Sequence, residues 1–354
     1  MHQAGLQACK LSILPIFLTL QAYYSAVMMN DLINGFPKQL EEAVGIAQNA
    51  KLTKPKHVIN KVVICGLGGS GIGGTILKET IQHQATVPIE VMKSYTLPAY
   101  VDEHTLVICS SYSGNTEETL ESFAEAKKHN AHIVCVTSGG KMLELAKTNG
   151  YDAIVIPAGM PPRACLGYSL TQLFKILEFH GIAPSYSAQI LSSAKLLIEH
   201  QASLMKAAQR MAEILVDKTP VIYSTSLHEG VAIRFRQQLN ENSKVLCWHH
   251  VIPEMNHNEL VGWSQEYPNI AVLLFRDTEE HPRNEIRIEL CKKIFENFAP
   301  VVLEIPSKGK SPLEKKLYWI YFGDWVSWYL SEIRKVDATE VKVIDQLKKD
   351  LSGK

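Results

Sequence analysis

The stretch KVVICGLGGSGIGG, residues 61–74, decides the fold. Its first five residues are a run rich in β-branched side chains, of the kind that forms a buried strand. The glycine-rich turn that follows leads into the helical pattern TILKETIQ, residues 75–82. Such a turn presents backbone N–H groups at the positive end of a helix dipole, where a phosphate is favoured. The stretch therefore predicts a strand–loop–helix unit with an anion site at the loop.

Further strand-like runs alternate with helical stretches along the chain. In the first half these runs are IEVMKS (89–94), TLVICSS (105–111), HIVCVTS (132–138) and DAIVIPA (152–158). The same order returns more weakly in the second half, with TPVIYST (219–225), NIAVLLF (269–275) and PVVLEIPS (300–307). Short strands separated by helices are typical of a parallel, doubly wound sheet. We predict an α/β protein of two doubly wound parallel-sheet units related by duplication.

The helical patterns set the predicted segments. Residues 30–50 are amphipathic and predict one helix, and residues 186–216 predict one or two long helices between the halves. The predicted organisation is an N-terminal extension at 1–28, a first unit with the phosphate loops at 29–185, a helical linker at 186–216, a second unit at 217–334 and a C-terminal helical tail at 335–354.

Charge and cysteine content limit the possible functions. Lys+Arg and Asp+Glu each number 36, so no overall field attracts nucleic acid or an anionic membrane, and we predict neither as a partner. The seven cysteines form no C-x-x-C pair, and three of them lie in apolar strand-like runs. Reduced, buried thiols in a cytoplasmic protein fit this pattern, and we expect neither a disulfide framework nor a zinc site.

The extension at 1–28 differs from the rest of the chain. Lys10 precedes LSILPIFLTLQAYYSAVMM, which has the basic start and apolar centre of a signal peptide. A proline and polar residues interrupt it, so it makes a poor membrane span. We expect it to lie upstream of a start at Met28 or Met29, because the chain that follows has cytoplasmic character.

A second loop suits the same kind of anion. SSYSGNTEET, residues 110–119, follows a strand, opens a helix and places three hydroxyl side chains within six residues. Helix capping accounts for one such side chain but not for three. The carboxyl ends of neighbouring strands form a ligand crevice in this architecture. The predicted phosphate-binding residues are Gly69, Ser70, Ser111, Ser113 and Thr116.

The glycine spacing also admits a dinucleotide site. Gly66, Gly68 and Gly71 have the G-x-G-x-x-G spacing, and Glu90 lies near the expected position of a ribose-binding acid. A dinucleotide domain has no use for a second hydroxyl-rich loop beside the first, whereas a compact phosphomonoester does. We therefore predict no cofactor and keep a dinucleotide-dependent dehydrogenase as a lesser alternative.

The two loops together resemble those of the sugar isomerase (SIS) domain, whose Ser/Thr-rich loop holds the phosphate of a phosphosugar. Three further blocks are similar, in the same order, to signatures of the bifunctional phosphoglucose/phosphomannose isomerases. They are PPRACLGYS (161–169), RFRQQLNENSK (234–244) and PEMNHNELVGW (253–263). The resemblance covers roughly residues 30–350. It implies phosphorylated hexoses as ligands and interconversion of glucose 6-phosphate and mannose 6-phosphate with fructose 6-phosphate.

The resemblance also implies roles for four residues. Moving a proton between C1 and C2 through a cis-enediolate needs a base, a charge partner for the oxyanion and an acid/base for ring opening. Glu241 of the LNEN motif would be the base, and Arg163 would stabilise the enediolate. His257 of MNHNE would open the ring; in similar enzymes it can come from the partner subunit, which implies a homodimer with a shared site. Lys348 of the C-terminal helix is the fourth candidate, with Lys349 adjacent.

From the residues alone, each of these side chains also has an ordinary role. Glu241 could be a solvated carboxylate near a helix end, although the dipole disfavours an anion there. Arg163 could be an ion-paired surface residue, and Lys348 a solvated helix lysine. His249, His250 and His257 are close in sequence but lack a helical i,i+4 pair and cysteine support, so we expect no metal.

Three alternatives stay open at this point. Glu254 and Glu259 flank His257 and compete with it as acid/base residues. An isomerase specific for one epimer fits the same motifs. A non-catalytic phosphosugar sensor is possible on the fold alone, but residues 1–60 show no basic helix-turn-helix segment of the kind a regulator would carry.

Overall fold

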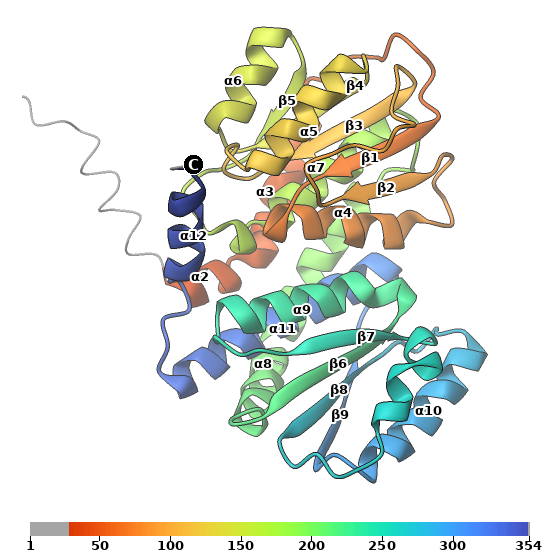
Figure 1. Cartoon of the computed structure of the whole chain (residues 1–354), viewed down its shortest axis with the longest axis vertical. Helices are drawn as coiled ribbons and strands as arrows, with labels where there is room; N and C mark the ends of the chain where they lie inside the picture. The colour runs from red at the N-terminus through yellow and green to blue at the C-terminus, as the bar shows by residue number, and fades with distance from the viewer. Residues whose placement is uncertain (1–27, 353–354) are drawn as a thin grey trace, which may run out of the picture.

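The structure, a computed structural model, describes residues 28–352, so the predicted extension lies outside the described residues except for Met28. Figure 1 shows two α/β halves placed end to end along the long axis of the molecule. None of the helices within the described range combines the length and apolarity that crossing a membrane requires.

Two helices open the described chain where the sequence predicts one. They are α2 (Met29–Asn34) and α3 (Phe36–Gln48). Pro37 lies in the first turn of α3, where its missing N–H costs nothing, but its ring cannot continue a helix that arrives from the N-terminal side. The single predicted helix is therefore wrong in one detail, a break at Gly35.

The first half is a five-stranded parallel sheet with the order β2-β1-β3-β4-β5. Its strands are β1 (Lys61–Cys65), β2 (Ile89–Met92), β3 (Thr105–Ser110), β4 (His132–Thr137) and β5 (Asp152–Val155). Its helices are α4 (Gly68–Ile81), α5 (Glu117–Lys128), α6 (Gly140–Asn149) and α7 (Leu166–Phe179). The strand order reverses between β1 and β3, so the loops after these two strands flank the crevice where open α/β sheets bind ligands.

The second half repeats this order in a four-stranded parallel sheet, β7-β6-β8-β9. Its strands are β6 (Thr219–Thr225), β7 (Trp248–Ile252), β8 (Ile270–Arg276) and β9 (Val301–Pro306). Its helices are α9 (Glu229–Glu241), α10 (Pro282–Glu296) and α11 (Pro312–Arg334). The prediction of two doubly wound parallel-sheet units is confirmed. Strand β7 was not predicted, because WHHVI is a half-buried edge strand with two histidines and no clear alternation.

One hydrophobic core runs between the two sheets. Helices α5 and α6 cover the outer face of the first sheet, and α10 covers the outer face of the second. Side chains of the inner faces join a continuous cluster with α4, α7, α9 and α11, in which Trp319 and Tyr321 of α11 are fully buried. Helix α8 (Ser187–Ile214), the single long helix that forms in the 186–216 stretch, lies along α11 and α3. The two halves thus share their interior.

Helix α4 is held by two contacts with the second half of the chain. A buried ion pair joins Glu79 of α4 to Lys316 of α11, with Nζ and Oε2 3.1 Å apart, and the Gly230 amide donates to the same carboxylate at 2.7 Å. A buried charge is retained only when it is paired in this way. The second half therefore fixes the helix whose first turn carries the GGSG sequence.

The glycine-rich stretch is more helical than predicted. Helix α4 begins at Gly68 and not after residue 74, so most of the glycines lie inside its first two turns. A Cβ atom placed on Gly71 would lie 2.2 Å from the Gly66 carbonyl oxygen. The glycines are thus required for close backbone approach and not for a long flexible loop.

Candidate active site

The two predicted phosphate loops meet at the carboxyl ends of β1 and β3. The Tyr112 amide donates to Ser70 Oγ at 2.9 Å, which joins the start of α4 to the loop after β3. Within that loop the buried Ser111 hydroxyl donates to Thr116 Oγ1 at 2.9 Å, while Ser113 is exposed and its hydroxyl accepts from the Asn115 amide. The structure therefore places the five predicted phosphate-binding residues together, where the loops after β1 and β3 meet.

Two helix starts lie where these loops meet, and their first backbone N–H groups have no side-chain cap. Leu67 precedes α4 and Thr116 precedes α5, and neither side chain caps the first turn of its helix. The ordinary capping role considered for Thr116 is thus not realised, because its hydroxyl is engaged with Ser111 instead. Uncapped helix N-termini that point to one place form an anion site.

Arg163 lies beside Glu241, although the two are far apart in sequence. The guanidinium is buried, and its Nη1 donates to Glu241 Oε2 at 3.3 Å. Nε donates to Asn242 Oδ1 at 2.7 Å, and Nη2 donates to the carbonyl oxygens of Ala338 and Thr339 at 2.5 and 3.0 Å. Burial lowers the pKa of Arg163 while Glu241 opposes the shift, and a guanidinium stays charged in such a site. Glu241 remains 27% exposed and so faces accessible space.

The backbone of Arg163 is held as firmly as its side chain. Arg234 of α9 donates from Nη2 to the Arg163 carbonyl at 3.0 Å and to Asp324 Oδ2 at 2.7 Å. Gln238 donates to the other oxygen of Asp324 at 2.8 Å. Sequence analysis missed Arg234 and Gln238 as supporting residues. The signal was present, because residues 234, 238 and 241 lie on one face of a helix.

The phosphate crevice and the Arg163–Glu241 pair form one site. Gly69 packs against the turn Pro162–Ala164, since a Cβ atom at Gly69 would lie 2.8 Å from the Pro162 carbonyl oxygen. The site is thus built from the start of α4, this turn and the end of α9, at the junction of the two halves.

His257 is not brought to this site within one chain. It is exposed in a short 3-10 helix, Glu254–His257, which follows the carboxyl end of β7. Glu241 is the last residue of α9, which runs antiparallel to β7 and is about 20 Å long over its 13 residues. Glu241 therefore lies near the amino end of β7, and His257 lies beyond its carboxyl end. Figure 1 shows α9 and β7 running past each other. Any meeting of His257 with Glu241 therefore requires a second chain.

The residues that compete with His257 have local partners. Glu259 Oε1 accepts from Trp248 Nε1 at 3.2 Å and also from the Tyr223 hydroxyl, and Glu254 accepts from Asn258 Nδ2 at 2.9 Å. These contacts give Glu259 a structural role in the loop after β7. Within residues 28–352 no group of three or more His, Cys, Asp and Glu side chains is arranged to hold a metal ion.

Lys348 lies on α12 (Lys342–Ser352), which follows the segment that contacts Arg163. The side chain is exposed, and no hydrogen bond or ion pair joins it to Arg163 or Glu241 in the described chain. The structure therefore places Lys348 on an element attached to the site but does not bring it into contact with the other candidates.

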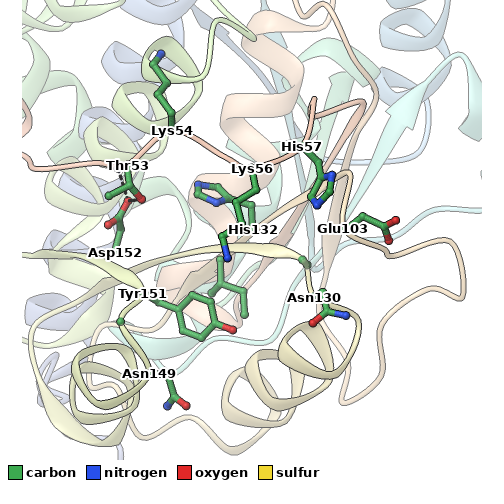
Figure 2. A pocket seen from close by; sticks show the side chains of 13 residues that line it. Thr53, Lys54, Lys56, His57, Glu103, Asn130, His132, Asn149, Tyr151 and Asp152 are labelled. Atoms are coloured by element: carbon green, nitrogen blue, oxygen red, sulfur yellow. Dashed lines mark hydrogen bonds between the residues drawn. The ribbon is translucent and has the colours of Figure 1, made fainter.

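A cavity of about 660 Å³ lies at the amino-terminal end of the first sheet's strands, among the segments that precede β4 and β5. Figure 2 shows Thr53 joined to Asp152, whose carboxylate accepts from the Thr53 amide and hydroxyl at 2.6 and 2.9 Å. Lysines, histidines and carboxylates are mixed along its wall, so it offers no concentrated positive charge to a phosphate. We assign it no part in the site.

The fold and two family models place the chain in the SIS class. The SIS domain model matches residues 57–156, and the model for the bacterial phospho-glucose isomerase C-terminal SIS domain matches residues 204–351. Two solved structures share the fold at low identity. The C-terminal domain of glucosamine-fructose-6-phosphate aminotransferase from Francisella tularensis aligns with a TM-score of 0.70 and 16% identity over 90% of this chain and 99% of that one. Tagatose-6-phosphate ketose/aldose isomerase from Escherichia coli aligns with a TM-score of 0.66 and 14% identity over 89% and 95%.

Curated relatives narrow the class to one family. A bifunctional phosphoglucose/phosphomannose isomerase of Caldicellulosiruptor bescii is 39% identical over 92% of this chain and 99% of the relative. The protein of the same name from Aquifex aeolicus is 39% identical over 82% and 90%. The chain belongs to the bifunctional phosphoglucose/phosphomannose isomerase family and is an enzyme of the intramolecular oxidoreductase class. A D-glucosamine-6-phosphate 4-epimerase of Sulfolobus acidocaldarius, 33% identical over 69% of this chain and 79% of its own length, is also similar.

Proposed function

We propose that this protein interconverts glucose 6-phosphate and mannose 6-phosphate with fructose 6-phosphate through a cis-enediolate. The observation that carries the proposal is the contact between Arg163 and Glu241. It pairs a carboxylate able to move a proton with a fixed positive charge, next to the loops proposed to bind the phosphate.

The hydrogen bonds of Arg163 leave a donor at the right place. A guanidinium has five N–H groups. Those on Nε and Nη2 are taken by Asn242 and by the two tail carbonyls, and one on Nη1 points to Glu241. The second Nη1–H, adjacent to Glu241, is the donor we assign to the enediolate oxygens. The guanidinium thereby stabilises the charge that develops as Glu241 removes the carbon-bound proton.

Glu241 acts as the base in this proposal. Its carboxylate removes the C2 proton of the open-chain aldose, and the electron pair moves to form the enediolate and place charge on O1. The protonated carboxyl then returns the proton to C1 while the proton on O2 passes to O1. O2 becomes the carbonyl oxygen of the ketose and O1 becomes its hydroxyl. Because C2 is trigonal in the enediolate, the two C2 epimers converge on one intermediate, and one base serves both aldoses if the remainder of the sugar turns about the C2–C3 bond.

The other proposed roles follow from placement. Gly69, Ser70, Ser111, Ser113 and Thr116 bind the phosphate at the uncapped starts of α4 and α5. His257 of the partner subunit opens the sugar ring, since an imidazole can exchange protons near neutral pH. The partner's His257 is assigned because the His257 of the same chain lies far from Glu241. The active enzyme is on this proposal a cytoplasmic homodimer with a shared site. Lys348 completes the site from α12.

Metal independence is part of the proposal. Isomerisation by proton transfer needs a positive charge near O1 and O2, and Arg163 supplies one that stays ionised at any working pH. A Lewis acid has no further step to perform. The alternative of a non-catalytic sensor is disfavoured, because a sensor has no use for a buried arginine held from every side beside a carboxylate.

A coupled assay tests the proposal. Purified protein is given fructose 6-phosphate with EDTA present, and glucose 6-phosphate and mannose 6-phosphate are measured separately. Both products form with the wild type and with Glu229→Gln at the other end of α9, whereas Glu241→Gln loses activity by about 100-fold or more. A single product narrows the substrate to one epimer.

Three results would contradict the proposal. Activity that survives in Glu241→Gln removes the assigned base. Absence of both products, with conversion of glucosamine 6-phosphate at C4 instead, would place the chain with the epimerase relative. Binding of fructose 6-phosphate without turnover would leave a sensor.

A further inference from the structure

Four consecutive backbone carbonyls of the C-terminal tail are held by two cations. The oxygens of Ala338 and Thr339 accept from Arg163 Nη2. Those of the flanking residues Asp337 and Glu340 both accept from Lys244 Nζ at 2.8 Å. The segment therefore crosses the proposed catalytic pair with every carbonyl from 337 to 340 directed at a positive charge.

Lys244 also reaches back to the proposed base. Its Nζ donates to the Glu241 carbonyl at 2.6 Å, so all three ammonium hydrogens have an acceptor. That carbonyl lies at the end of α9, where the helix dipole favours a cation. Lys244 thus bridges the end of α9 and the tail, and a neutral side chain cannot satisfy the same three oxygens.

The acidic side chains of the tail do not compete for this ammonium. Asp337 Oδ1 accepts from the Thr339 amide at 2.7 Å, and Glu340 Oε1 accepts from the Lys342 amide at 3.0 Å. Each carboxylate thereby fixes the local turn of the segment. The tail is shaped by its own side chains. It is attached through its backbone carbonyls to Lys244 and Arg163 and through the buried Ala338 side chain to the core.

We propose that Lys244 is a positioning residue for the isomerase reaction, the latch that holds residues 337–340 across Arg163 and so orients its guanidinium beside Glu241. The inference rests on the proposed function and deepens it. Arg163 Nη2 has no other acceptor than Ala338 and Thr339 in the described chain. When the segment leaves, this end of the guanidinium loses its anchor and Nη1 is no longer fixed toward the enediolate.

The latch also determines where α12 lies. Helix α12 has no extensive packing contact with another helix or strand of the described chain, and its Ile344, Leu347 and Leu351 are exposed. Its position relative to the site is set through residues 337–340. Loss of the Lys244 contacts removes two of the four carbonyl anchors and would therefore loosen the tail, including Lys348.

Lys244→Met removes the ammonium and keeps the stem, and Lys335→Met is its matched control. Both lysines are exposed and have a left-handed backbone, with φ of 56° and 55°, and the Lys335 side chain has no hydrogen bond or ion pair within residues 28–352. We expect Lys244→Met to lower kcat on the order of 10- to 100-fold through misorientation, with KM changed by less than about threefold. The melting temperature should stay within about 2 °C of the wild type. Lys244→Arg should recover part of kcat, and Lys335→Met should match the wild type.

Two further measurements separate a latch from a merely structural lysine. Trypsin should cut after Lys342, Lys348 and Lys349 faster in Lys244→Met than in Lys335→Met, because the freed tail is accessible. A chain ending at Val336 should show the same kcat defect, and adding Lys244→Met to it should cause no further loss. This non-additivity is the signature of two changes that act through one contact.

Several outcomes overturn the inference. A kcat for Lys244→Met within twofold of the wild type removes the positioning role, and unchanged trypsin cleavage removes the latch. Losses that multiply in the truncated chain show that Lys244 acts elsewhere. If the wild type does not isomerise fructose 6-phosphate, the proposed function fails and the positioning role with it, while the trypsin comparison still decides whether Lys244 holds the tail.

Discussion

Gly69 and Pro162 meet through backbone atoms alone, with no room for a Cβ atom between the first turn of α4 and the Pro162 carbonyl. This contact joins the phosphate crevice to the turn that carries Arg163. In the proposed site, this close-packed contact sets the distance between the phosphate-binding loops and Arg163.

Gly69→Ala is expected to push these two segments apart. Forcing a methyl group into a closed backbone contact costs about 1–3 kcal/mol, and here the displaced segments are the phosphate crevice and Arg163. We expect KM for fructose 6-phosphate to rise and kcat to fall in steady-state assays. Gly73→Ala is the control, because its Cβ would meet other atoms only at 3.5 Å or more. It should keep activity and gain slightly in stability as a better helix former. Equal kinetics for the two variants would contradict the proposed coupling.

Arg163→Lys should retain the fold and lose most of the activity. A lysine carries the charge but lacks the planar fork of donors of a guanidinium. It therefore cannot donate hydrogen bonds to Asn242, Glu241 and the tail carbonyls at once. We expect kcat to fall by about 100-fold or more, as for the loss of an oxyanion donor. Circular dichroism and thermal melting check the fold. Exposed Arg283→Lys is the matched control, and similar rates for both variants would argue against the role.

Mixed dimers test the proposed origin of His257. Subunits with Glu241→Gln and subunits with His257→Gln are each inactive alone. After unfolding and refolding together, half of the dimers are hybrids with one intact shared site, which restores about a quarter of the wild-type activity. If His257 served its own chain, the mixture would stay inactive. Activity in the His257→Gln protein alone would show that another group opens the ring.

Stability should fall in mild acid because of buried histidine. Burial, together with the positive charges of His132 and Lys54, lowers the pKa of His180 to about 4. Burial lowers the pKa of His132 as well. The unfolded chain then binds protons first as pH falls, so folding free energy is lost between about pH 6.5 and 4. Urea unfolding across this range should show His180→Phe losing less than the wild type, by on the order of 1 kcal/mol. His129→Phe, at an exposed position, should leave the slope unchanged. An equal slope in the His180 variant would contradict the assignment.

The strands that lie buried on both faces were predictable, whereas one of the edge strands, β7, was not. KVVIC and TLVICS are apolar runs rich in β-branched residues, a pattern that predicts a buried strand, and both form central strands. WHHVI lies at the sheet edge, where burial imposes no continuous apolar pattern, and it escaped prediction. The start of α4 was also misplaced, because glycines that permit close packing look the same in a sequence as glycines that form a loop.

The candidate site was predictable where motifs carry it. The resemblance supplied Arg163 and Glu241, and the structure brings them together across 78 residues of sequence. The contacts of Arg163 with Ala338 and Thr339 were not predictable, since backbone carbonyls leave no mark on side-chain identity. The role proposed for His257 needs a second chain, which one sequence does not describe.

The core between the two sheets has a consequence for folding. Helices α4, α7, α9 and α11 bury their apolar faces against each other across the junction. A product of either half alone would leave those faces in water and would lack either Arg163 or Glu241. The two halves therefore form one cooperative unit, and we expect neither to fold or to assemble the Arg163–Glu241 pair without the other.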